Sequence, residues 1–410
     1  MVGPTKSCAA LNLVFLRPER LPCLTQPPLG LYTGSISRTP VGRALFRGRA
    51  HSQGEPHRHA SQVRDAGTVN CASTLSSGDR GMLLTATCSA AGAVAILTIA
   101  MMPTNAGGAE ALTLDRIHLR DPYILPVPQE GKYYLFGTGW TLPDGPGFMV
   151  YTSTDLQAWH GPRPAFTCPD GFSSVNYWAP EVHLYRGRYY MFATFFSKTE
   201  DSSRNTRILV AEEPGGPYRF HSPGPVTPRD WYCLDGTLFV DQEGLPWMVF
   251  CHEWVQIGDG SICAVRLSED LRQSVGEPVV LFKASAAPWV TPIGTAPRGR
   301  VTDGPFLHRA ANGDLLMLWS SFGEGGYKLA VARSESGVLL GPWTHPPKPL
   351  YEDDGGHGML LLEFGGQLLL VLHQPNSQSR ERPRIFSVHE HEQATLTLSP
   401  WPSPTTPAQN

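Results

Sequence analysis

Acidic and imidazole residues recur at intervals of 54 to 68 residues in this chain of 410 residues, each at the start of a short apolar stretch. The five residues are Asp121, Glu181, Asp235, Asp303 and His357. Carboxyl groups gathered in one place can share acid–base chemistry, because one can hold a proton while another stays ionised. Hydrolysis of a glycosidic bond needs two carboxyl groups in these two states. A fold that brings the five residues together would therefore be equipped for such chemistry.

Each of these residues opens a unit of three predicted strands that are separated by short polar turns. The second strands are KYYLFGT, RYYMFAT, PWMVFCH, LLMLWSS and LLLVLHQ, and the third strands are FMVYTS, RILVAE, ICAVRL, KLAVAR and RIFSV. A fixed period of about 40 to 60 residues built of strands is typical of a β-propeller. A β-sandwich has similar strand spacing but no fivefold unit of this length. We therefore expect an all-β fold, a five-bladed β-propeller over residues 112–398.

In a propeller blade, the start of the first strand and the end of the second strand lie at the same rim. The residues that end the second strands should therefore surround the axis together with the five opening residues. They include Thr138, Trp140, Thr194, Phe195, His252, Glu253, Ser320, Ser321, His373 and Gln374. Carboxylates that bind hydroxyl groups and aromatic rings that stack on sugar faces suit a sugar pocket. The sequence thus predicts a central, funnel-shaped active site.

The residues before the propeller differ in composition. Residues 1–80 contain ten Lys and Arg against four Asp and Glu, and residues 1–81 lack apolar periodicity, so we expect a disordered or untranslated leader. Residues 82–106 form an uncharged apolar run followed by small residues, typical of a signal peptide that starts at Met82. A membrane anchor and an organelle transit peptide are the alternatives. We expect a secreted or periplasmic protein, with residues 399–410 as a tail.

Charge and cysteine content give no indication of a nucleic-acid-binding protein, a membrane-binding protein or a cysteine metal site. A net charge of −3 gives no argument for nucleic acid or an anionic membrane as a partner, so neither is expected. The eight cysteines show no spacing typical of a metal site. Cys251 and Cys263 lie on neighbouring predicted strands. The sequence allows either a disulfide between them or two buried free thiols.

Four motifs of this chain resemble those of glycoside hydrolase family 43. They are RDPYI, WAPEV, DGTLF and DGPF, and they occur in this order and in register with the repeats. The resemblance covers residues 114–390. It implies a five-bladed propeller enzyme that acts on arabinose- and xylose-containing polysaccharides with inversion at the anomeric carbon. RDP alone also occurs in invertase-type propellers, whereas the motifs together are specific.

The resemblance implies roles for individual residues. Asp121 takes the position of the general base that activates water, and Asp235 takes the position that orients the acid and adjusts its pKa. The general acid of the family is a Glu before Gly-Pro or Ala-Pro, where this chain has Asp303. Asp is shorter by one methylene group, and a displacement of about 1 Å can cost roughly a hundredfold in rate. The acid is therefore either Asp303 or Glu253, in the CHEW segment, with a slight preference for Glu253.

Further residues are predicted to bind substrate or an ion. The candidates for substrate contact are Glu181, Trp178, Trp140, Trp254, His373 and Arg384. The Trp rings would either stack on sugar or pack between blades. The resemblance implies that Glu181 faces the pocket. The resemblance also places an ion on the axis in many relatives, so His357 is predicted to bind an optional calcium ion. No cofactor is otherwise required.

The residues and the resemblance together predict an inverting glycoside hydrolase. It would release terminal α-L-arabinofuranosyl or β-D-xylosyl residues from plant-type polysaccharides or oligosaccharides, acting as a monomer. Exo action is expected because the segments 195–206 and 253–261 are long enough to close one end of the funnel. The alternatives are a β-galactofuranosidase or fructosidase on the same propeller and a non-catalytic carbohydrate-binding propeller. The missing family Glu is the main argument for the last of these.

Overall fold

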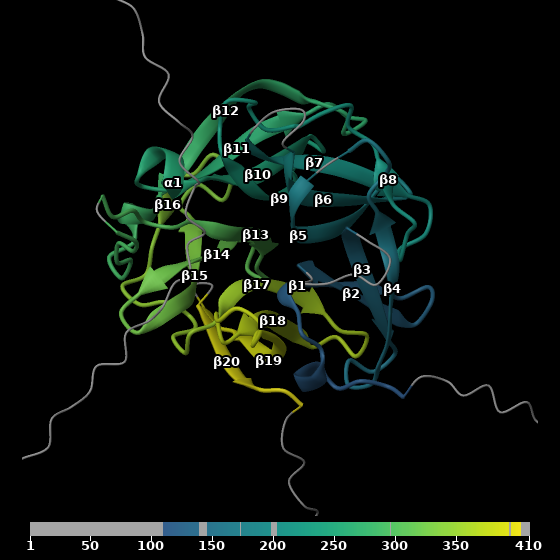
Figure 1. The fold of residues 1–410 in the computed structure, drawn as a ribbon. Helices are drawn as coiled ribbons and strands as arrows, with labels where there is room; N and C mark the ends of the chain where they lie inside the picture. Colours follow the sequence, from purple (N-terminus) through teal and green to yellow (C-terminus); the bar gives the residue numbers. More distant parts are fainter. Residues whose placement is uncertain are drawn as a thin grey trace, which may run out of the picture. The chain divides into compact units, whose positions relative to one another are not determined.

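The computed structural model describes residues 110–138, 146–172, 174–197, 203–295, 297–392 and 395–402. Their strands form five four-stranded antiparallel sheets, and within each sheet the strands follow one another in chain order. The sheets are arranged around a central axis like the blades of a propeller (Figure 1). The structure therefore confirms the predicted all-β, five-bladed propeller.

The five blades are built from twenty strands within these residues. Blade one contains β1 (Arg120–Val127), β2 (Lys132–Thr138), β3 (Gly147–Ser153) and β4 (Trp159–Thr167); blade two contains β5 (Ser174–Tyr185), β6 (Arg188–Ser197), β7 (Arg204–Ala211) and β8 (Arg219–Phe220). Blade three contains β9 (Cys233–Val240), β10 (Pro246–His252), β11 (Ser261–Leu267) and β12 (Ser274–Lys283). Blade four contains β13 (Asp303–Arg309), β14 (Leu315–Gly323), β15 (Gly326–Ser334) and β16 (Trp343–Thr344); blade five contains β17 (Gly356–Leu362), β18 (Leu368–Gln374), β19 (Arg382–Glu390) and β20 (Leu396–Pro400).

Helical structure in the described residues is limited to three short segments. They are η1 (Leu114–Arg116), α1 (Trp254–Ile257) and η2 (Ala284–Ala286). None of these helices is long and apolar enough to cross a membrane. The predicted leader, residues 1–81, and the apolar segment, residues 82–106, lie outside the described residues.

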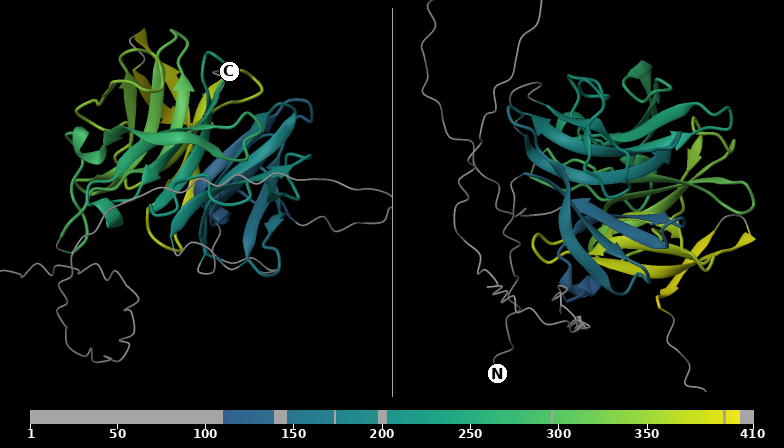
Figure 2. Two further views of the ribbon diagram at one scale, coloured as in Figure 1. Left: turned by 90° about the horizontal axis from the view of Figure 1, so that it is seen from above. Right: turned by 90° about the vertical axis from the view of Figure 1, so that its right-hand side faces the viewer.

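The core lies between neighbouring blades. The second strand of each blade is buried over most of its length, because another blade packs against each face of its sheet. This explains why the second strands are continuous apolar runs rather than alternating ones. Large rings such as Trp159 and Trp319 fill the spaces between sheets. Blade five packs against blade one in this way and closes the ring (Figure 2).

A β-bulge interrupts every innermost strand near its start. The ladder loses register between Arg120 and Tyr123 in β1 and at the corresponding place in β5, β9, β13 and β17. One residue in each bulge has a positive φ, between 43° and 56°: Asp121, Ala179, Asp235, Gly304 and His357. A bulge changes the direction of the side chain at that position from the direction it would have in a regular strand.

The bulges show that the five opening residues are not equivalent. Asp121, Asp235 and His357 occupy the positive-φ position itself. Glu181 lies two residues after it and Asp303 one residue before it. The prediction from sequence therefore identified the repeating unit correctly. It placed Glu181 and Asp303 at the same position of the repeat as the other three residues, whereas they lie at neighbouring positions.

Candidate active site

A cavity of about 450 Å³ lies on the propeller axis and is lined by residues from all five blades. Its carboxyl groups belong to Asp121, Asp235, Glu253, Asp303 and Glu381, and its rings belong to Trp178, Trp254, Phe322 and His357. A larger cavity of about 600 Å³ lies between the outer strands of blades four and five, and no Asp or Glu lines it. The axial cavity is therefore the candidate active site.

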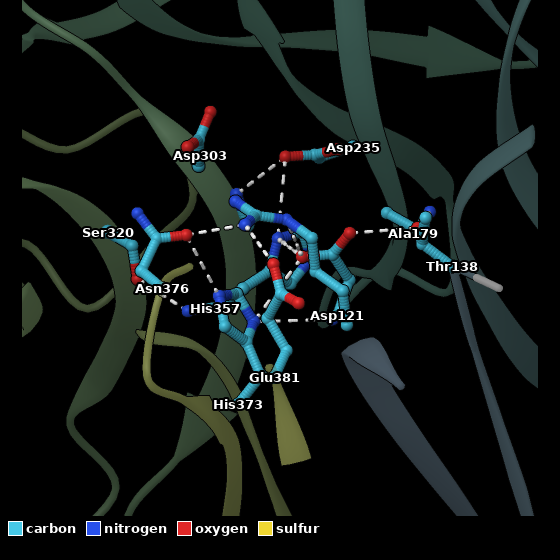
Figure 3. Close-up of polar contacts among 12 residues, drawn as sticks. Asp121, Thr138, Ala179, Asp235, Asp303, Ser320, His357, His373, Asn376 and Glu381 are labelled. Atoms are coloured by element: carbon cyan, nitrogen blue, oxygen red, sulfur yellow. Dashed lines mark hydrogen bonds and ion pairs between the residues drawn. The ribbon is translucent and has the colours of Figure 1, made fainter. Parts of the chain in front are cut away.

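Asp121 is buried in the bulge of β1, where several groups hold its carboxylate (Figure 3). Thr138 Oγ1 donates a hydrogen bond to Asp121 Oδ2 at 2.8 Å. Asp121 Oδ1 lies 3.3 Å from Arg120 Nε and 3.2 Å from His357 Nδ1. Burial raises the pKa of Asp121, but His357 and Arg120 outweigh it and bring the pKa below its usual value. Asp121 is thus an ionised carboxylate that can accept a proton.

Asp235 is buried in the bulge of β9 and bonds to two other blades. Its backbone N–H donates to Thr194 Oγ1 of blade two at 2.9 Å, and its Oδ2 accepts the N–H of Gly304 in blade four at 3.0 Å. Burial and the nearby charge of Asp121 raise the pKa of Asp235 well above its usual value. Asp235 is therefore placed to influence the protonation of neighbouring carboxyl groups.

Asp303 begins β13 on the wall of the cavity. Tyr327 donates a hydrogen bond from its hydroxyl group to Asp303 Oδ2 at 2.9 Å. Burial, followed by the charge of Asp235, raises the pKa of Asp303 to about 7. His357, Arg120 and Tyr327 act in the opposite direction without cancelling the rise. Asp303 therefore keeps its proton at mildly acidic pH and can donate it.

Glu253 also lies on the cavity wall, directly before α1, but its carboxylate is paired with a cation. Glu253 Oε2 forms an ion pair with Arg204 of β7, whose guanidinium lies 4.7 Å from the centre of the Trp178 ring. Burial raises the pKa of Glu253, while Arg204 opposes this rise. A carboxylate held by a guanidinium is suited to building a binding wall with Trp178. Asp303 is the better placed proton donor.

His357 brings an imidazole to the axis, but it is not part of a larger group of metal ligands. Its Nδ1 faces Asp121 Oδ1 and lies 3.7 Å from Asp235 Oδ2. Among the described residues, no three His, Cys, Asp or Glu side chains are arranged to hold a metal ion. Calcium takes six to eight oxygen ligands, which include water, and the side chains beside His357 supply the carboxylates of Asp121 and Asp235. The axial calcium ion stays a prediction, and no chemical step is assigned to it.

Two other predicted substrate-binding residues line the cavity. Trp178 and Trp254 contribute their rings to it, from blade two and from α1. Trp254 also packs against Gly294 and Gly299, since a Cβ on Gly299 would meet its ring at 2.2 Å. Trp140 lies outside the described residues.

The remaining three predictions of substrate contact are not matched by the structure. Glu181, displaced by the bulge, is buried with its Oε2 3.4 Å from His183 Nε2. His373 is fully buried behind Asp121, and burial lowers the pKa of its ring to about 3. Arg384 is exposed on β19, because strand alternation turns it away from the axis. None of these three side chains lines the cavity.

Several residues that hold the site were not predicted. Arg120 contacts Asp121, Asn376 and Glu381, and the last two come from the segment between β18 and β19. Arg120 precedes Asp121 within the RDP motif, so a sequence signal existed. Tyr327 lies in a third strand, and no motif there indicates that it reaches the axis.

An axial cavity in which the pKa of one carboxyl group is lowered and the pKa of two others is raised is suited to glycoside hydrolysis. The model of the family described as Glycosyl hydrolases family 43 matches residues 116–391. The chain belongs to this family, as its motifs indicated.

Several known proteins resemble the chain over the propeller. The solved structure of an endo-arabinase from Bacteroides thetaiotaomicron VPI-5482 is 41% identical, with a TM-score of 0.64, covering 69% of this chain and 99% of that one. Extracellular endo-alpha-(1->5)-L-arabinanase 1 of Bacillus subtilis (strain 168) is 25% identical over 296 residues, which are 67% of this chain and 80% of the relative. An alpha-L-arabinofuranosidase from Lactobacillus brevis, 21% identical with a TM-score of 0.56, covers 69% of this chain and 94% of its own and shares the fold.

Proposed function

We propose that this glycoside hydrolase cleaves α-L-arabinofuranosyl linkages in arabinan with inversion at the anomeric carbon. The observation that carries the proposal is the opposite direction of two pKa shifts in one cavity. The pKa of Asp121 is lowered, whereas that of Asp303 is raised to about 7. Below about pH 7 Asp303 keeps its proton, while the lowered pKa of Asp121 favours its ionised form, and glycoside hydrolysis requires one carboxyl group in each state.

The proposed reaction uses both carboxyl groups in one step. Asp121 removes a proton from a water molecule, whose oxygen attacks the anomeric carbon. Asp303 gives its proton to the leaving oxygen as the glycosidic bond breaks. Repulsion between Asp235 and Asp303 when both are ionised raises the pKa of Asp303, which supports the role of Asp235 as the adjusting carboxyl group.

Arabinan is proposed as substrate because two relatives that match most of the propeller carry arabinanase names. Both names also specify endo action, which supports internal cleavage rather than the exo action expected from loop length. A specific feature favours exo action as the second candidate. Trp254 and Ile293 line the cavity, and Gly294 and Gly299 lie against the Trp254 ring, so one side of the cavity has a wall that favours binding of a chain end.

The products from linear α-1,5-arabino-oligosaccharides distinguish these modes. Internal cleavage by the full chain should give fragments of intermediate length from the first time points. Release of one short product from one end, while the remaining chain shortens stepwise, would instead establish exo action. Aryl α-L-arabinofuranoside and β-D-xyloside, tested in parallel, identify the sugar.

Substitutions test the catalytic roles. Asp121→Asn and Asp303→Asn should each lower kcat about 10²- to 10⁴-fold, the usual range for loss of a general base or acid. Glu253→Gln should mainly raise KM, because Glu253 builds the wall with Arg204 and Trp178. A large loss of kcat in Glu253→Gln, together with full activity of Asp303→Asn, would reassign the acid to Glu253. Circular dichroism spectra of all variants show whether the propeller is intact.

We also propose that the enzyme acts outside the cytoplasm. Two observations support this proposal: one relative is named an extracellular enzyme, and residues 82–106 of this chain have the composition of a signal peptide. Expression of the full chain with its own leader should give a protein in the medium or periplasm that begins just after the apolar run. N-terminal sequencing of that protein would show the cleavage site, and retention of residues 82–106 would contradict the proposal.

A further inference from the structure

A ring of hydrogen bonds joins each blade to the next around the cavity. At four of the five seams, a side chain at the end of a second strand accepts the bulge N–H of the following blade. The acceptors Thr138, Ser320 and His373 can be followed in the close-up (Figure 3). The pairs are Ala179 N with Thr138 Oγ1 at 2.7 Å, Asp235 N with Thr194 Oγ1 at 2.9 Å, His357 N with Ser320 Oγ at 2.8 Å, and Asp121 N with His373 Nδ1 at 3.3 Å.

The four acceptors occupy one position in the blade. Each lies directly opposite the residue that precedes the bulge in the neighbouring strand: Thr138 opposite Arg120, Thr194 opposite Trp178, Ser320 opposite Asp303 and His373 opposite Gly356. The repeat thus provides a strong side-chain acceptor at a fixed point of each of these four blades.

The seam between blades three and four is the exception. There the bulge N–H belongs to Gly304, and it donates to the carboxylate of Asp235 instead of to β10. The residue of β10 at the acceptor position is Cys251, which lies opposite Leu234 and is fully buried. Burial, Asp235 and Asp303 all raise the pKa of Cys251, so its thiol stays neutral. A neutral thiol is a weak hydrogen-bond acceptor.

The seam between blades three and four joins two carboxyl groups of the site, Asp235 and Asp303. Gly304 immediately follows Asp303, so its N–H fixes the backbone of Asp303 to the carboxylate of Asp235. Gly304 also lies close to the His357 ring, since a Cβ there would meet the ring at 2.8 Å. The hydrogen bond therefore links the backbone beside Asp303 to the carboxyl group of Asp235.

We propose that Cys251 is a positioning residue whose weakly accepting thiol leaves the Gly304 N–H to Asp235 and so couples Asp235 to Asp303. This inference rests on the proposed role of Asp303 as the acid. A hydroxyl group at position 251 would compete for the N–H, as Thr138, Thr194 and Ser320 do at their seams. Asp235 would then lose the bond that favours its ionised form. Asp235 would hold its proton more tightly, so the repulsion that raises the pKa of Asp303 would weaken and the pKa of Asp303 would fall.

The test compares Cys251→Ser, which introduces a strong acceptor, with Cys251→Ala, which introduces none. In Cys251→Ser the basic limb of the pH profile of kcat/KM should move to lower pH by about half a unit to one unit. Its kcat should fall about tenfold because Asp303 is less well fixed. Cys251→Ala should keep the limb of the wild type. Cys263→Ser is the matched control, since Cys263 is an equally buried free thiol on β11.

A second readout does not depend on activity. The carboxyl carbon of Asp303 can be titrated by ¹³C NMR without substrate and assigned through its loss in Asp303→Asn. Its titration should move to lower pH in Cys251→Ser and not in Cys251→Ala or Cys263→Ser. Equal titrations in all proteins, or equal shifts in Cys251→Ser and Cys251→Ala, would overturn the inference. Full activity of Asp303→Asn would contradict the proposed acid role while leaving the NMR comparison intact.

Discussion

At the scale of single residues, a tyrosine holds the proposed acid, Asp303, which is shorter than the Glu that the family resemblance implies at this position. Tyr327 donates to Asp303 Oδ2 from β15, and its ring stacks on His373 with centroids 5.7 Å apart. Gly356 leaves room for that ring, because a Cβ there would meet Tyr327 Cε1 at 2.5 Å. The position of the Asp303 carboxyl group thus depends on packing between blades four and five.

Removal of this hydroxyl group should change the pH dependence of the reaction. Activity of the wild type should fall as pH rises through about 7, where Asp303 loses its proton. The Tyr327 hydrogen bond lowers the pKa of Asp303, so Tyr327→Phe should move this basic limb to higher pH. The measurement is the pH profile of kcat/KM. Tyr218→Phe is the control, since that hydroxyl group bonds to Pro214 O outside the cavity. An unchanged limb in Tyr327→Phe would contradict the assignment of Asp303 as the acid.

Motifs in the sequence predicted the residues of the site that begin inner strands. Asp121, Asp235 and Asp303 all line the cavity, because their spacing follows the repeat that builds it. Tyr327 and Glu381 escaped prediction because they reach the site from a third strand and from the segment before one. Contacts of this kind depend on how blades pack, which strand periodicity does not encode.

At the scale of elements, the bulges and the hydrogen bonds between blades act together. Each bulge turns a backbone N–H toward the preceding blade, where a hydroxyl or imidazole group accepts it at four seams and the Asp235 carboxylate accepts it at the fifth. The N–H groups are buried, so loss of an acceptor leaves a polar group without water or a partner.

Ser320→Ala should therefore destabilise the seam between blades four and five. The variant leaves the N–H of His357 without its acceptor, which costs about 1–3 kcal/mol for a buried donor. The midpoint of urea unfolding should fall without a change in slope. Ser274→Ala, at an exposed position of β12, should be neutral. Equal midpoints for Ser320→Ala and the wild type would show that water or another group replaces the hydroxyl.

Strand patterns predicted all five blades, but they did not predict the bulges. Apolar runs and polar turns are local properties, and they identified the second and third strands. A bulge depends on how two strands pair, so the displacement of Glu181 and Asp303 within the repeat was missed. Arg384 was misplaced for a related reason, since the face that a residue takes depends on register.

At the scale of the whole molecule, the site reduces stability at neutral pH. The folded protein raises the pKa of Asp303 from the ordinary 3.8 to about 7. The folded state therefore holds this proton more tightly than the unfolded chain does. Its contribution to stability is complete below pH 3.8 and is lost as pH rises through about 7.

Asp303→Asn should consequently be more stable than the wild type at pH 8 and no more stable at pH 4. Asn keeps an acceptor for Tyr327 and cannot ionise. The expected gain at pH 8 is on the order of 2–4 kcal/mol, since one pKa unit corresponds to about 1.4 kcal/mol. Melting temperatures at the two pH values provide the measurement. Asp314→Asn, which removes an ion pair with Arg333 on the surface, should show no gain at pH 8. A wild type that is more stable than Asp303→Asn at pH 8 would contradict the raised pKa.

The ring of blades closes without exchange of a strand between its first and last blades. Every sheet consists of consecutive strands, and the two ends of the ring meet through contacts such as Arg382 Nε of β19 with Asp115 O of η1 at 2.8 Å and Arg120 of β1 with Glu381, which directly precedes β19. The order of blades around the axis is therefore independent of where the polypeptide is cut. A circular permutant that links residue 402 to residue 110 and opens at the exposed residues 346–348 would begin with blade five and still assemble the same cavity.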